Sequence, residues 1–409
     1  MRVSTNMMYQ RGVRSLQNAN ERLDTANQQL TTGYKFSSAG DDPVGMSQSQ
    51  SLSTKIGLYN QYNNNAGLLN SSLSLEETSL TSINTSLSRA YTLMQQANSG
   101  ALSSTDRASV ATSLSEIQKQ LLDLMNSKNA DGEYIFGGNQ SQTPPFAADG
   151  NDVYNFQGDT GQRQIQVAPS VTIPSNDSGL ALFQSVATRR TAQATSTSAS
   201  PVTVAVSDQS SYENFYKNTY DYNTAANNVF TIQTSAGSGG AADQYSIFDT
   251  STPPKVLASG TYQAGNAISF NGLSLTMSAA AGSSASFQLD APQNDNILNT
   301  LSKAIATLNN SATSGSSITD LAAEVETHLS NAMNVVNTKL GEIGGRMNTL
   351  DDVMSSNSSL GSIATEAKAN VSEVDIYAAI SKVSQEQNSL TVAQQAYTKI
   401  SKASLFDYL

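Results

Sequence analysis

Two helical seams, one toward each end of the chain, constrain the fold more than any other feature. In the first 30 residues, apolar side chains recur at alternating steps of three and four, the a/d spacing of a coiled-coil seam. A longer series runs from Tyr59 to Ala97, where eleven of the twelve seam positions are apolar and Glu76 is the exception. The first seam consists of Leu16, Ala19, Leu23, Ala26 and Leu30.

The same periodicity returns toward the C-terminus. Helices are expected at 110–124, where Ser103 and Asp106 form a capping box, at 297–308, and at 322–353, where Lys339 and Arg346 interrupt the apolar series. The last helix has a strict seven-residue spacing. Its seam consists of Ile376, Val383, Leu390 and Tyr397, with Ala379, Ala393 and Ile400 at intermediate or following positions.

The middle of the chain has no helical period. Gly, Pro and Asn become frequent after residue 129, and short alternating or β-branched runs indicate strands. Asn271-Gly272 is a tight hairpin turn between two of them. The candidate strands are 134–136, 153–156, 164–167, 202–206, 229–233, 245–248, 267–270, 273–277 and 286–289.

The order helix, strand, helix predicts an α+β fold in which both ends form a helical rod and an all-β domain is inserted. Narrow seams bury little surface in a lone chain, so we expect the terminal seams to order on assembly. The expected domains are a terminal helical domain of 1–50 with 361–409, a rod of 51–130 with 291–360, and an outer domain of 131–290. The low-complexity stretch 191–200 is either a loop or a boundary between two β subdomains.

Composition excludes several functions. The net charge is −11, and residues 131–290 hold twelve acidic and five basic side chains, which argues against nucleic acid and anionic membranes as partners. No cysteine is present, which excludes disulfides and zinc ribbons. No apolar run is long enough for membrane insertion. Charged residues make up only 13% of the chain, which suits surfaces buried against further copies.

Asp41 and Asp42 form an adjacent carboxylate pair, followed by Pro43. Such a pair could serve a metal or acid–base site. It also suits a helix start, with Asp42 as N-cap and Pro43 at the first helical position. Because adjacent carboxylates rarely converge on one point, and no His or Cys is nearby, the sequence favours the helix start.

His328 is the single histidine, four residues after Glu324. A zinc-protease site would need a second histidine. We therefore expect an exposed histidine or one at the edge of the bundle. Gly137-Gly138 lacks the further glycines and the lysine of a phosphate loop. The sequence therefore predicts no catalytic residue, cofactor or metal site, and a protein that is not an enzyme.

Three stretches resemble the bacterial flagellin superfamily. Residues Ala26–Gly45, which contain Thr-Thr-Gly and Ser-Ala-Gly-Asp-Asp-Pro, resemble its N-terminal signature. Ile343–Leu350 resembles its C-terminal rod signature, and Glu373–Leu409 its last helix. The resemblance covers about 1–170 and 295–409.

Three further features resemble the superfamily members that join the flagellar hook to the filament: Met1–Thr5, Gly132–Gly138 followed by Thr143–Phe146, and Ser404–Leu409. The resemblance implies a secreted, extracellular structural subunit of the flagellum, exported by the type III pathway without signal cleavage. The implied partners are further copies in a ring, hook-associated protein 1, flagellin, which assembles on its surface, and a flagellar export chaperone. Nucleic acid and membrane insertion are not expected.

Alternatives remain at this point. The chain could be the flagellin of the filament itself, although the junction-type start and finish argue against it. The region 190–290 matches no pattern of the family, and it could bind a glycan or adhesion ligand through loops without a motif. A hydrolase in the outer domain is disfavoured by the single histidine and the lack of cysteine.

Overall fold

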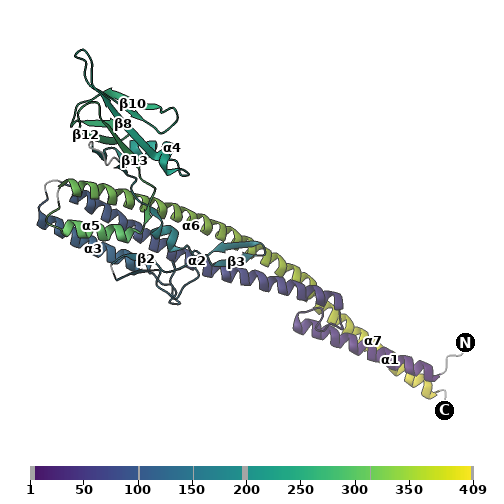
Figure 1. Ribbon diagram of the computed structural model, residues 1–409. Helices are drawn as coiled ribbons and strands as arrows, with labels where there is room; N and C mark the ends of the chain where they lie inside the picture. Colours follow the sequence, from purple (N-terminus) through teal and green to yellow (C-terminus); the bar gives the residue numbers. More distant parts are fainter. Residues whose placement is uncertain (1–4, 100–101, 151, 196–200, 314, 407–409) are drawn as a thin grey trace. The chain divides into compact units, whose positions relative to one another are not determined.

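The computed structural model describes residues 5–99, 102–150, 152–195, 201–313 and 315–406 (Figure 1). Parts of three sequence features lie outside these residues. They are 1–4 of the opening stretch, 407–409 of the closing stretch and 196–200 of the low-complexity stretch.

Long helices come from both ends of the chain and antiparallel strands from its middle, which confirms the predicted α+β class. The helices are α1 (Thr5–Thr32), α2 (Pro43–Ala97), α3 (Ser104–Met125), α4 (Gln209–Thr219), α5 (Ile297–Asn309), α6 (Gly315–Ser372) and α7 (Ile376–Phe406). A π-helix spans Leu180–Gln184, and a 3₁₀ helix spans Ala225–Asn228. The strands are β1 (Phe146–Ala148), β2 (Tyr154–Phe156), β3 (Gln164–Ala168), β4 (Val171–Pro174), β5 (Val186–Ala187), β6 (Ala192–Ala194), β7 (Val202–Val206), β8 (Val229–Ser235), β9 (Gln244–Phe248), β10 (Val256–Thr261), β11 (Ala267–Phe270), β12 (Leu273–Met277), β13 (Ser284–Leu289) and β14 (Asn294–Asp295).

Two compact units make up the chain. The terminal unit comprises 1–71, 164–174 and 345–409, and the central unit comprises 72–163 and 175–344. These bounds differ from the expected domains in two ways. The expected rod is divided between the units, and the β3–β4 hairpin groups with the terminal helices.

Helices of the central unit share an apolar core. The seam positions of α2 in this unit, such as Leu80 and Leu87, are fully buried, as are Leu114 of α3 and Leu301 of α5. The predicted capping box of α3 is confirmed, because the side chain and backbone of its N-cap both exchange hydrogen bonds with the third residue of the helix. Periodicity therefore identified the bundle correctly.

His328 is fully buried, so the expectation of an exposed or bundle-edge histidine is wrong. Its Nδ1 lies 2.6 Å from Oγ1 of Thr300, and its Nε2 lies 3.2 Å from the carbonyl oxygen of Val186. Segments remote in sequence, α5 and β5, thus cover this face of α6. Burial lowers the pKa of His328 and favours the neutral ring.

A β domain, residues 192–289, occupies much of the central unit. Its five-stranded sheet has the order β10-β9-β8-β13-β6, and its three-stranded sheet the order β11-β12-β7. The two sheets and α4 share one core, in which the rings of Phe230 and Phe287 stack at 5.4 Å and Phe270 meets Phe287 edge-on. This packing of sheets and helix makes the domain a unit with its own apolar interior.

The predicted hairpin at Asn271-Gly272 is confirmed. Phe270 pairs with Leu273, which leaves a two-residue turn, and φ is 48° at Asn271 and 83° at Gly272. Positive φ at both positions is the conformation of a type I′ turn. A Cβ on Gly272 would also lie 2.4 Å from the carbonyl oxygen of Asp208, so only glycine fits this position.

The expectation of an all-β middle is wrong for residues 209–219, which form α4. Asp208 caps this helix by accepting hydrogen bonds from two backbone amides of its first turn. Tyr212 and Tyr216 lie four residues apart on one face and are fully buried. Each hydroxyl donates to a backbone carbonyl at 2.6 Å, so the buried polar atoms are satisfied. One predicted strand, 134–136, is also absent, since Tyr134 forms only an isolated bridge with Lys128.

Phe287 tests the core of the β domain. Replacing a fully buried phenylalanine by alanine costs about 3–5 kcal/mol, so Phe287→Ala should lower the urea midpoint of this domain strongly. Val256, which is 51% exposed in the same domain, gives the control, and Val256→Ala should change stability by no more than about 0.5 kcal/mol. Near-ultraviolet circular dichroism of the tyrosines reports the unfolding. Equal midpoints for the two variants would contradict the assigned core.

Candidate functional site: the paired chain ends

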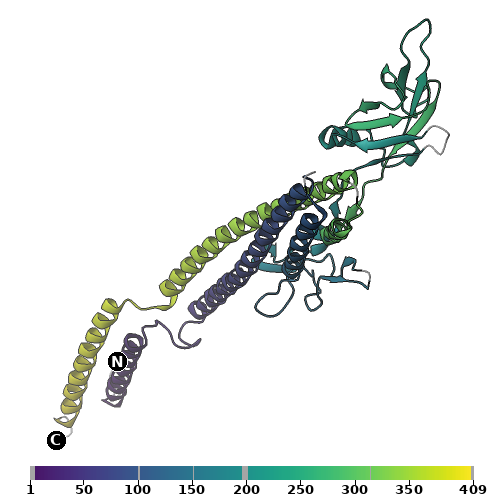
Figure 2. The same cartoon turned by 90° about the vertical axis from the view of Figure 1, so that its left-hand side faces the viewer.

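Helices α1 and α7 lie side by side and antiparallel, so the two ends of the chain form one structure (Figures 1 and 2). The most buried residues of α1 are Ala19 and Ala26, while the predicted seam residues Leu16, Leu23 and Leu30 are half-buried. Small residues let the helix backbones approach closely, and the leucines cover the edges of the contact. The N-terminal seam thus lies where the sequence placed it, and its role in assembly stays a prediction.

The C-terminal seam agrees in part. Val383, Leu390 and Tyr397 are half-buried on the face that contains the buried Ala379. Ile376 is 60% exposed, so within one chain it is not buried with the rest of the seam, and its part in an assembly seam stays a prediction. It opens α7 at the end of the paired length, where α1 has already given way to an extended segment. Helix α7 continues through position 400, but the side chain of Ile400 lies outside the described part of the structure.

Polar and aromatic contacts fix the register of the helix pair. Arg22 Nε lies 3.0 Å from Glu386 Oε2. Nearer the chain ends, the rings of Tyr9 and Tyr397 lie 5.5 Å apart. A Cβ on Gly12 would lie 3.0 Å from the ring of Tyr397, so glycine lets this ring approach α1. The hydrogen bond with Tyr9 raises the pKa of Tyr397, so the hydroxyl of Tyr397 stays protonated at neutral pH.

Short extended segments connect the helix pair to α2 and α6. Helix α1 ends at Thr32, and Gly33, with a φ of 75°, turns the chain away from the helix. Beyond it, Lys35 N donates to Ser372 O at 2.7 Å, and Val374 N donates to Gly33 O at 2.9 Å. The two connections therefore pair with each other and do not run independently.

The predicted helix-start turn has the geometry of a cap. Helix α2 begins at Pro43, and Asp42 Oδ1 accepts hydrogen bonds from Val44 N at 3.1 Å and Gly45 N at 2.9 Å. These amides belong to the first turn, which has no other acceptors for them. Asp42 is thus the N-cap of α2.

Asp41 has a separate task from Asp42. Its Oδ2 accepts hydrogen bonds from the backbone amides of Ser37 and Ser38 at 3.0 and 2.9 Å. These bonds, that of Ser37 first, lower the pKa of Asp41, and the carboxylate holds the loop before α2. The two carboxylates serve different amides, which supports the helix-start interpretation over a shared acid–base or metal site.

The terminal unit leaves many large apolar side chains open to solvent. Among the described residues, thirteen of the sixteen exposed large apolar or tyrosine side chains belong to it. A concentration of exposed apolar side chains in one unit makes its surface a candidate for contacts with other subunits. The thirteen are Met7, Met8, Tyr9, Tyr34, Val44, Leu58, Leu68, Leu360, Ile363, Ile376, Tyr377, Ile380 and Val392.

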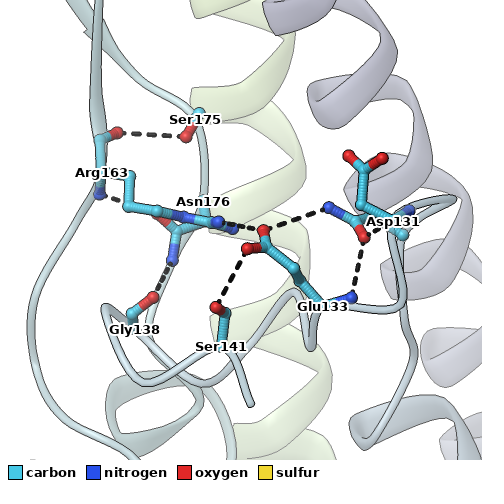
Figure 3. A network of polar contacts seen from close by, with 8 residues as sticks. Asp131, Glu133, Gly138, Ser141, Arg163, Ser175 and Asn176 are labelled. Carbon is cyan, nitrogen blue, oxygen red and sulfur yellow. Dashed lines mark hydrogen bonds and ion pairs between the residues drawn. The ribbon is translucent and has the colours of Figure 1, made fainter.

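A polar network in the central unit organises the stretch Gly132–Gly138 (Figure 3). Arg163 Nη1 lies 2.6 Å from Glu133 Oε2, and Ser141 Oγ donates to the other carboxylate oxygen at 3.2 Å. The hydrogen bond from Arg163 holds the pKa of Glu133 below its ordinary value and outweighs the opposing effect of burial. Sequence reasoning missed this pair, because residues 30 positions apart in irregular segments show no periodic signal.

The same network joins the two chain segments that flank the β3–β4 hairpin. Asn176 Oδ1 accepts from Arg163 N at 2.8 Å, and Asn176 Nδ2 donates to Gly138 O at 3.1 Å. Ser175 N donates to Arg163 O at 2.8 Å. Gly138 has a φ of 72°, and a Cβ there would lie 2.3 Å from the carbonyl oxygen of Asp159, so only glycine fits this position.

Neither a metal centre nor a membrane span is found within the described ranges. No group of three His, Asp or Glu side chains there could hold a metal ion. None of the described helices is both long enough and apolar enough to cross a bilayer.

Comparison with known proteins identifies the family to which this arrangement is related. Residues 3–141 match the bacterial flagellin N-terminal helical region. Flagellar hook-associated protein 3 of Escherichia coli (strain K12) is 31% identical over 193 residues, which are 47% of this chain and 60% of that protein. The protein of the same name from Salmonella typhimurium is 35% identical over 146 residues, which are 36% of this chain and 46% of that protein.

Solved structures share the fold. The crystal structure of hook-associated protein 3 from Legionella pneumophila matches with a TM-score of 0.59 at 23% identity, over 79% of this chain and 98% of that one. The matches confirm the predicted resemblance to flagellins and the predicted fold class. The matched proteins are named as a flagellin helical region and as flagellar hook-associated protein 3. Against its two curated relatives the chain spans 60% and 46% of their length.

Leu390 tests the helix pair. In Leu390→Asp, a half-buried side chain loses its apolar contact and a charge is placed against α1, which together cost about 2–3 kcal/mol. Amide hydrogen exchange in α1 should therefore become faster. The exposed Thr391 provides the control, and Thr391→Asp should leave exchange unchanged. Equal exchange in the two variants would show that Leu390 does not contact α1.

Arg163 tests the cause assigned to the lowered pKa of Glu133. In Arg163→Gln, the pKa of Glu133 should rise toward its ordinary value of about 4.3, as measured by NMR titration of the carboxyl carbon. The pKa of Glu133 is lower in the folded state than in the unfolded state. The ion pair therefore stabilises the fold at pH values above the ordinary pKa of glutamate, and this stabilisation is lost as the pH falls through the lowered pKa. Lys119→Gln, which breaks an exposed pair with Glu116, should leave Glu133 unchanged. An unaltered pKa in Arg163→Gln would contradict the assigned cause.

Proposed function

We propose that this chain forms part of the junction between the flagellar hook and the filament, and offers the surface on which flagellin assembles. The named relatives support this role, as both are flagellar hook-associated protein 3. The stretch Gly132–Gly138, which resembles the junction-type members, is held in one conformation by the Glu133–Arg163 network. The junction is therefore a more specific fit than the filament.

The apolar surface of the terminal unit is the observation that carries the proposal. A lone chain leaves thirteen large apolar or tyrosine side chains open there. A ring of copies would bury them, and the energy gained would recur in every copy. The contact between α1 and α7 is centred on alanines, so the pair gains only modest stability by itself. The terminal helices are accordingly proposed to become fully ordered on assembly, with the leucine seams on the inside.

The proposed partners follow from this position. Further copies pack side by side in the ring, hook-associated protein 1 lies on the hook side, and flagellin lies on the filament side. An export chaperone covers the terminal helices before secretion by the type III pathway. The chain has no cysteine, so nothing in it can be trapped by disulfides during passage in an unfolded state.

Deletion of the gene separates the two flagellar candidates. If the chain is a junction protein, the deletion strain should still bear hooks and should release flagellin monomer into the medium. If the chain is the filament subunit, the strain should bear hooks and release no flagellin. The second result would replace the proposed function by that of flagellin.

Ile380 tests the exposed surface. It is 48% exposed on α7, so Ile380→Asp should leave the monomer folded and secreted. In the ring, the new charge would be buried between copies and should lower retention on hooks by at least about tenfold. A tenfold change corresponds to about 1.4 kcal/mol. The readout is the ratio of cell-attached to released protein in a complemented deletion strain. Val256→Asp, equally exposed in the β domain, is the matched control and should be retained. Normal retention of Ile380→Asp would remove this face of α7 from the assembly contact.

A further inference from the structure

Three tyrosines lead from the core of the β domain to its surface. Tyr216 is fully buried, and its hydroxyl donates to the carbonyl oxygen of Asp290 at 2.6 Å. The ring of Tyr220 stacks on it at 4.6 Å, with 10° between the planes. Tyr222 meets Tyr220 edge-on at 4.9 Å and is 66% exposed. The outermost ring is therefore braced by two rings beneath it.

The loop that presents Tyr222 is held by its own hydrogen bonds. Asp221 Oδ1 accepts from Asn223 N at 2.8 Å and from Thr224 N at 3.1 Å, and its Oδ2 accepts from Asn227 Nδ2 at 2.6 Å. Asn228, which is buried, binds both the amide and the carbonyl of Asp221 at 2.7 and 2.9 Å. The conformation of the loop is thus set before any ligand arrives, which lowers the entropy cost of binding.

Packing does not account for the exposed end of this ladder. The hydroxyl of Tyr222 and the side chains of Asn223 and Thr224 make no hydrogen bond with any described residue, and all three residues are exposed. An exposed aromatic ring and two exposed neutral side chains that can form hydrogen bonds therefore occupy adjacent positions.

The chemistry of the surroundings narrows the ligand. Residues 218–254 contain no lysine or arginine, so the loop offers no cation to a phosphate, sulfate or nucleic acid. Arg190 is the nearest guanidinium to the ladder, and it is occupied by the ring of Tyr216 and the carboxylate of Glu213. An aromatic face beside amide and hydroxyl groups suits a ligand that is apolar on one face and carries neutral hydroxyls at its rim.

We propose that Tyr222, Asn223 and Thr224 form a binding site for a neutral β-linked pyranose oligosaccharide. In such a sugar the ring substituents are equatorial, so the axial C–H bonds form a flat apolar face that stacks on Tyr222. The hydroxyls at the edge of the ring exchange hydrogen bonds with the amide of Asn223 and the hydroxyl of Thr224. This activity is additional to the junction role and does not depend on it.

Saturation-transfer NMR and calorimetry of the full chain with chitotetraose and cellotetraose test the site. We expect at least one of these tetrasaccharides to bind the wild-type chain. In Tyr222→Ala affinity should fall by at least about tenfold, a loss typical of a central aromatic contact. Tyr222→Phe keeps the ring and should retain most of the binding. Tyr377→Ala, which removes an 87% exposed tyrosine from α7, is the matched control and should bind like the wild type.

Three outcomes would overturn the proposal. The first is no binding of either tetrasaccharide by the wild-type chain. The second is equal binding by the wild type and Tyr222→Ala, which would move any site elsewhere. The third is preference for a sulfated heparin tetrasaccharide, which would exclude a neutral ligand. The urea midpoint of the β domain checks folding, and Asn223→Ala gives a second variant that leaves the aromatic ladder intact.

Discussion

The antiparallel pairing of α1 with α7 is the contact on which the rest of the structure depends. It joins the two ends of a chain of 409 residues, and the hydrogen bonds between Gly33 and Val374 and between Lys35 and Ser372 extend it into the connecting segments. The chain between these segments therefore begins and ends at the same place in the structure. The order of helices and strands along the sequence reflects this requirement.

Heptad spacing predicted both members of the pair because a seam is a local property of a helix. It did not predict how the seam is used. Ala19 and Ala26 are buried more deeply than the leucines of the same seam, since close approach of two helices favours small side chains. Ile376 has the right spacing but is exposed. Spacing alone does not show where the partner helix ends, so the sequence could not predict this exposure.

The remaining differences between sequence and structure have the same origin. The turn at Asn271-Gly272 and the cap at Asp42 were predictable, since each depends on neighbouring residues. The burial of His328 depends on α5 and β5, and Glu133 meets an arginine from a distant irregular segment. Helix α4 was missed because Tyr212 and Tyr216 pack into a core formed by distant strands, and their hydroxyl acceptors also lie in distant segments. Long-range packing leaves no trace in a local pattern.

The β domain enters and leaves the helical frame through a single pair of short strands, where Ala187 of β5 lies opposite Asn294 of β14. Residues opposite each other in an antiparallel pair are only about 5 Å apart, so a tight turn would bridge the gap. The domain is thus a cassette that evolution can enlarge, exchange or discard without disturbing the helices on either side. Selection on what the cassette meets outside the cell can proceed separately from selection on the helices that assemble.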